Sequence, residues 1–64
     1  MKDMNKSEIA DSILSMALTM EDISLEMRPY WPEKARELMG AAEIARDWAN
    51  GIYAEIYAEI EEES

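Results

Sequence analysis

Cysteine, histidine and phenylalanine are absent from this 64-residue chain, and glycine and proline occur only twice each. Without cysteine the chain has no disulfide, and without cysteine or histidine it lacks the usual ligands of a structural zinc site. No nucleophile lies beside a base, so we expect no enzymatic activity and no cofactor. A chain this short gains little net stability from its own core, and self-association is the stabilising route that remains.

Basic residues are also scarce, with six lysines and arginines against fifteen acids and a net charge of −9. Direct binding to nucleic acid or to an anionic membrane surface is therefore not expected, because both need a basic face. No apolar run approaches the roughly 18 residues of a membrane span, and no signal peptide is visible. These features predict a cytoplasmic protein.

The first half of the chain has the pattern of one amphipathic helix, at about residues 6–27. Asn5 followed by Glu8 is typical of a capping box at a helix start. Large apolar residues then recur at steps of four and three, which is the period of a helix stripe. The stripe consists of Ile9, Ile13, Met16, Met20, Ile23 and Met27.

Two prolines predict the linker and the start of a second helix. The residue before Pro29 is pushed out of the helical region, so we expect the first helix to end there. Pro32 suits the first position of a helix, where its missing N–H costs nothing. The pattern predicts a linker at residues 28–31 and a helix at about residues 32–61. A linker this short makes the helices antiparallel, so residues 1–64 form one all-α helical hairpin.

Asn50-Gly51 is a dipeptide often found in turns. The apolar period nevertheless runs through it, from Ala45 and Ala49 to Ile52. We therefore favour one continuous helix, with a kink or break at this dipeptide as the alternative.

The apolar surface of the second helix is too wide for one partner helix to cover. This predicts a helical-bundle homo-oligomer, at least a dimer. The expected oligomer interface is Leu38, Ala42, Ala45, Ala49, Ile52, Ile56 and Ile60. The small residues near Gly40 favour close helix packing, with the approach of a flat ligand as the alternative.

Aromatic and basic residues gather around the linker and along the second helix. Arginine forks pair with phosphate and aromatic faces stack on bases, so the cluster suggests a site for a small anion. The candidate ligand-binding residues are Arg28, Tyr30, Trp31, Arg36, Arg46 and Trp48. Alternatively, Arg36 and Arg46 pair with neighbouring acids on the same helix, and the aromatic rings close the end of the hairpin.

Acidic pairs at helical spacing, such as Glu43 with Asp47, could in principle hold Mg²⁺. Solvated helix faces explain them better, and we expect no metal site.

The segment from Trp31 to Ile52, WPEKARELMGAAEIARDWANGI, resembles very small helical phage proteins. It is similar in particular to counter-defence sponges, which sequester nucleotide immune signals between subunits of a helical oligomer. The resemblance implies a homo-oligomer whose aromatic and arginine residues hold a nucleotide, in the cytoplasm of a bacterial host cell.

The acidity of the chain fits a rival class of phage protein, the anti-CRISPR or anti-restriction inhibitors that mimic DNA. Such an inhibitor presents a row of carboxylates to a basic protein partner. Here the row would consist of Glu43, Asp47, Glu55, Glu59 and the acidic tail. A third reading is a purely structural helical assembly module without a ligand.

Overall fold

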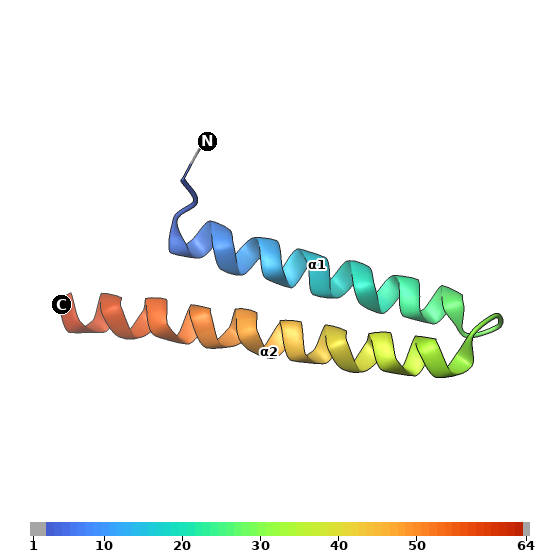
Figure 1. Cartoon of the computed structure of the whole chain (residues 1–64). Coiled ribbons are helices and arrows are strands. Elements are labelled where there is room, and N and C mark those ends of the chain that lie inside the picture. Colours follow the sequence, from blue (N-terminus) through green and yellow to red (C-terminus); the bar gives the residue numbers. More distant parts are fainter. Residues whose placement is uncertain (1–2, 64) are drawn as a thin grey trace.

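The chain folds into two antiparallel helices, α1 (Lys6–Met27) and α2 (Pro32–Glu63), as Figure 1 shows. The computed structural model describes residues 3–63, without the side chain of residue 63, and within this range it contains no strand. The predicted all-α helical hairpin is confirmed. The C-terminal end of α2 extends past the start of α1 (Figure 1).

Local contacts explain where the helices begin and end. The Asn5 side-chain oxygen accepts a hydrogen bond from the Glu8 N–H at 2.8 Å, which caps α1. At the other end, the Met27 carbonyl accepts from the N–H groups of Tyr30 and Trp31, at 2.9 and 2.7 Å. Arg28 keeps helical dihedrals, with φ −49° and ψ −45°, although it precedes Pro29. Helix α1 therefore ends because proline has no N–H to continue it, and the expected shift of Arg28 out of the helical region was wrong.

Small residues form the seam between the helices. They are not the large apolar residues of the stripe that the sequence pattern gave for α1. Residues seven apart share nearly the same direction on a helix, because each residue turns it by about 100°. All five apolar residues of the core are alanines, exposed by 2% or less, and the buried Ser24 joins them. They form two matching series, Ala10, Ala17 and Ser24 on α1 with Ala35, Ala42 and Ala49 on α2.

These small side chains let the two helix backbones approach closely. The larger apolar residues, such as Ile13 and Met20, are displaced to the edges of the seam, where they are only half-buried. Near the linker, the hydroxyl of the buried Ser24 donates a hydrogen bond to the Ala35 carbonyl and joins the helices. The alanine seam therefore uses little of the chain's large apolar surface.

Helix α2 continues without a break through Asn50 and Gly51. The predicted continuous helix is therefore confirmed. The apolar period on both sides of this dipeptide outweighs the preference of Asn-Gly for turns. Across residues 3–63, neither helix is long and apolar enough to cross a membrane.

Candidate functional site

Two of the candidate ligand-binding residues, Arg28 and Arg36, line one hollow at the linker end of the hairpin. The hollow has a volume of about 550 Å³. Its other walls include Pro32 at the first position of α2, and Glu43 one turn beyond Gly40. Two guanidinium groups around one hollow suit an anion, whereas the carboxylate of Glu43 opposes it.

Two further candidates, Tyr30 and Trp31, line an adjoining hollow of about 320 Å³. Their ring centroids lie 5.9 Å apart with the planes tilted by 52°. The rings do not plug the hairpin, because Tyr30 is 73% and Trp31 56% exposed. Pro32 lines both hollows, so two exposed aromatic rings adjoin the hollow of the two arginines.

The cations near the linker lack acidic partners. The ion pairs within residues 3–63 join Lys6 to Glu59 and Arg46 to Glu21, which leaves Arg28, Lys34 and Arg36 unpaired. Although the chain has a large excess of acids, Arg28 and Arg36 are available in one hollow to an external anion, and Lys34 lies in the next.

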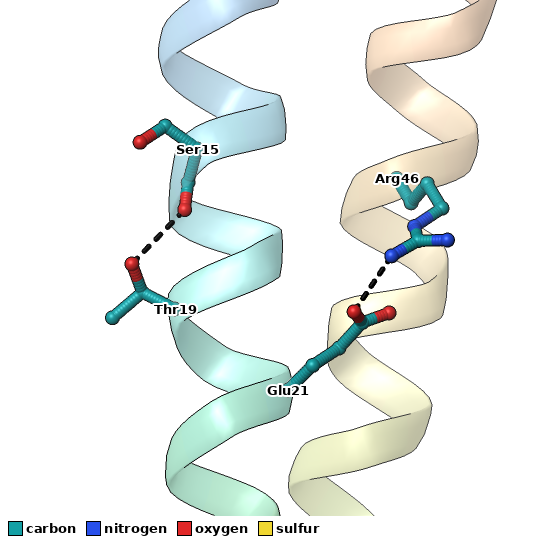
Figure 2. A network of polar contacts seen from close by, with 4 residues as sticks. All are labelled: Ser15, Thr19, Glu21 and Arg46. Carbon is teal, nitrogen blue, oxygen red and sulfur yellow. Dashed lines mark hydrogen bonds and ion pairs between the residues drawn. The ribbon is translucent and has the colours of Figure 1, made fainter.

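Arg46 is placed differently from the cations at the linker. Its guanidinium reaches across to α1 and donates a 2.6 Å hydrogen bond from Nη2 to Glu21 Oε2 (Figure 2). The Nε atom of Arg46 is buried, with no hydrogen-bond partner in the described part of the chain. The alternative of pairing with neighbouring acids on the same helix is therefore observed for neither arginine, because Arg46 pairs across to α1 and Arg36 forms no ion pair in the described residues.

Trp48 lies away from the linker, in a third hollow formed on α2 by Asp47, Gly51, Ile52 and Glu55. It is 67% exposed. By helix periodicity it lies on the opposite side of α2 from Arg46. Within one chain, the structure thus brings together four of the six candidates and leaves Arg46 and Trp48 apart from them.

The two sides of the hairpin differ in polarity. The Arg46–Glu21 ion pair and the hydrogen bond from the Tyr53 hydroxyl to Asp11 mark one side, which we call the polar side. The opposite side carries no charged residue between 9 and 27 on α1, and on α2 between 38 and 56 Glu55 borders it, seven residues from Trp48 and in the same hollow. We call it the charge-free face, and it consists of Ile9, Ile13, Met16, Met20, Ile23 and Met27 of α1 with Leu38, Ala41, Ala45, Trp48, Ile52 and Ile56 of α2.

The expected interface residues are divided between two locations. Ala42 and Ala49 are fully buried against α1, so they belong to the interface within the chain. Leu38, Ala45, Ile52 and Ile56 are half-buried on the charge-free face. Ile60 is 57% exposed, one residue past Glu59, which contacts Lys6 at the start of α1.

Sequence reasoning counted Lys34 in the cluster around the linker without committing it to the ligand site, and it did not identify the small residues of α1 that form the seam. Lys34 lines the hollow of Tyr30 and Trp31. The seven-residue spacing of Ala10, Ala17 and Ser24 was the available signal for the α1 surface. A series of small residues at that spacing marks the closest approach of two helices and leaves the larger stripe beside it uncovered.

Two polar contacts predict a decline in stability at alkaline pH. The hydrogen bond to Asp11 raises the pKa of Tyr53 above its ordinary 10.0, and the contact with Glu59 raises the pKa of Lys6 above its ordinary 10.5. Both contacts favour the protonated form in the folded state. Their contribution is therefore complete below the unfolded pKa values and is lost as pH rises through the higher folded values.

We expect the urea midpoint, at fixed protein concentration, to fall once the pH exceeds about 10. Tyr53→Phe should make this decline shallower, because it removes one of the two groups that titrate. Tyr30→Phe, in the exposed linker, is the control and should keep the wild-type profile. Identical profiles for both variants would show that the Tyr53–Asp11 contact does not contribute in solution.

Comparisons with protein-family models, curated proteins and solved structures find no match to this chain. In residues 3–63, no group of three acidic side chains is arranged to hold a metal ion.

Proposed function

We propose that this chain is a non-enzymatic binding protein that works as a homo-oligomer and holds a small phosphate-bearing ligand, such as a nucleotide, at the linker end. The observation that carries the proposal is the arrangement around Pro32. Arg28 and Arg36 share one hollow without acidic partners, and the exposed rings of Tyr30 and Trp31 line the next. The hollows match the two halves of a nucleotide, with the phosphate on the arginines and the base on a ring.

The chemistry of these side chains supports this assignment. A guanidinium presents a planar fork of donors that matches phosphate oxygens. Stacking of a base on an aromatic ring contributes about 1–3 kcal/mol. Glu43 and Glu33 line the two hollows and weaken the local positive potential. We therefore expect micromolar affinity, which corresponds to about 8 kcal/mol.

The resemblance to phage counter-defence sponges supports the ligand class. In that role, the oligomer would sequester a nucleotide immune signal and release it intact, because sequestration requires no chemical step. Cyclic dinucleotides, cyclic trinucleotides and ADP-ribose derivatives are the ligands to test first.

Calorimetric titration with these nucleotides, followed by chromatography of the released ligand, tests the proposal. We expect saturable micromolar binding of at least one nucleotide, recovered intact, and a loss of at least about tenfold in the Arg28→Ala/Arg36→Ala double variant. Arg46→Ala is the matched control, because Glu21 already engages that guanidinium. Binding by no nucleotide, or equal binding by the double variant, would contradict the proposal.

A second candidate function is inhibition of a basic protein, and the outer side of α2 favours it. Glu43, Asp47 and Glu55 are exposed there, and none forms an ion pair among the described residues. A spaced row of free carboxylates resembles the charge pattern of a nucleic-acid backbone. Absence of nucleotide binding, with capture of a purified basic nuclease that Asp47→Lys abolishes, would favour this candidate.

A further inference from the structure

The hairpin is a slab one helix thick. Its principal extents are 51 × 26 × 12 Å, and a helix with its side chains is about 10–12 Å wide. Its radius of gyration is 15.0 Å, whereas a compact domain of this length has about 11 Å. Folded domains bury their apolar faces between at least two layers. This chain supplies only one layer.

The exposed area gives the size of the missing layer. The chain exposes 5283 Å², whereas a folded monomer of its mass is expected to expose about 4,200 Å². The excess of about 1,000 Å² is comparable to the roughly 800 Å² that each partner buries in a standard interface. One stable protein interface accounts for it.

The charge-free face is the surface that a second layer would cover. It runs over both helices and contains half-buried and exposed apolar side chains, among them Met16, Ile23 and Trp48. Its extent over both helices suits another helical layer better than a small ligand. The polar side is less suited, because Arg46, Glu21 and Asp11 lie on it.

We propose that a second copy of this chain covers the charge-free face, as a two-fold symmetric four-helix bundle in which α2 packs antiparallel on the partner's α2. Symmetric pairing brings the same face of both copies together. This inference specifies the assembly part of the proposed function and does not depend on the ligand.

Charge complementarity sets the antiparallel direction. The linker end carries the unpaired cations Arg28, Lys34 and Arg36, and the far end of α2 carries Glu55, Glu59 and Glu62. Antiparallel stacking places the unpaired cations of each copy, which alternate with Glu33 and Glu37, over the acidic end of the other. The parallel alternative would bring like charges together at both ends.

Trp48 acquires a different role in this assembly. It lies at the midpoint of α2, which spans Pro32–Glu63. In an antiparallel α2 pair the midpoints meet, so Trp48 packs near the partner's Trp48 at the two-fold axis. We therefore assign Trp48 to the subunit interface instead of the nucleotide site.

Sedimentation equilibrium of the full chain in ligand-free buffer tests the face with a matched pair of variants. Ile23 on the charge-free face is 45% exposed, and Leu25 on the polar side of the same helix is 50% exposed. We expect a wild-type dimer, an increase in its dissociation constant of about 100-fold or more in Ile23→Glu, and little change in Leu25→Glu. A monomeric wild type, or the reverse order of the two variants, would overturn the proposal.

Spin labels test the direction, because the chain has no native cysteine. In a labelled Glu33→Cys dimer, the antiparallel arrangement puts the two labels about 45 Å apart, from the helical rise between residue 33 and the midpoint of α2. Labels closer than about 30 Å would overturn the antiparallel direction.

The two proposals fail in distinguishable ways. If Ile23→Glu is monomeric and the wild type binds no nucleotide, the assembly inference stands and the ligand proposal fails. If the wild type binds nucleotide as a monomer, the ligand assignment stands and the assembly inference fails.

Discussion

Replacing Ala42 with leucine is expected to lower the free energy of unfolding by about 1–3 kcal/mol, the usual cost of overpacking a filled site. Ala42 is completely buried, and it lies in the middle of the α2 series that begins at Ala35 and ends at Ala49. A leucine there must push the helices apart or leave its preferred rotamer. Because a chain of this size rarely has more than about 3–5 kcal/mol of stability, much of the hairpin should unfold.

Urea unfolding followed by far-UV circular dichroism measures this effect. Ala54→Leu is the matched control, since Ala54 is exposed on the same helix and leucine is almost as good a helix former as alanine. Its free energy of unfolding should stay within a few tenths of a kcal/mol of wild type. Equal midpoints for Ala42→Leu and wild type would show that the helices are not held by close contact of small residues.

Replacing both glycines with alanine is expected to raise the free energy of unfolding by about 2 kcal/mol, because each glycine costs a helix interior about 1 kcal/mol. Gly40 and Gly51 both lie inside α2, and an added Cβ would meet no atom within 4 Å at either position. The melting temperature should therefore rise by about 8–16 °C.

Thermal unfolding at fixed protein concentration checks this prediction, because the melting temperature of an oligomer depends on concentration. Ala54→Gly is the reverse control and should destabilise the helix by about 1 kcal/mol. Gly40 lines the hollow of Arg28 and Arg36, whereas Gly51 does not. The single variant Gly51→Ala should thus gain stability with unchanged nucleotide binding. No gain in either glycine variant would show that α2 is not helical at these positions in solution.

Much of the secondary structure was predictable because its signals act within one helical turn. The side chain of Asn5 caps its own helix at Glu8, and Pro32 starts α2 at the residue where its ring is tolerated. The end of α1 was predicted at the correct place for a partly wrong reason, since Arg28 remains helical. Both effects come from Pro29, one on the residue before it and one through its own missing N–H, so the predicted boundary was insensitive to the error.

The candidate site was predictable only in part. Arg28, Tyr30, Trp31 and Arg36 lie together because they are close in the sequence, on one linker and the first turns of α2. The environment of Arg46 depends on Glu21, which is 25 residues away on the other helix. No local rule pairs these two residues, so their contact had to come from the structure.

The sequence by itself determined the helix class, the position of the linker and the excess of apolar surface, since composition, period and capping are local properties. The tertiary structure decided which apolar residues form the seam. On α1, the stripe of large apolar residues and the series of small residues both have a period compatible with a helix. Only the distance between the two backbones selects the small series, Ala10, Ala17 and Ser24, for the seam. Close packing of small residues brings the helices together, and the larger side chains remain outside the seam, many of them on the charge-free face.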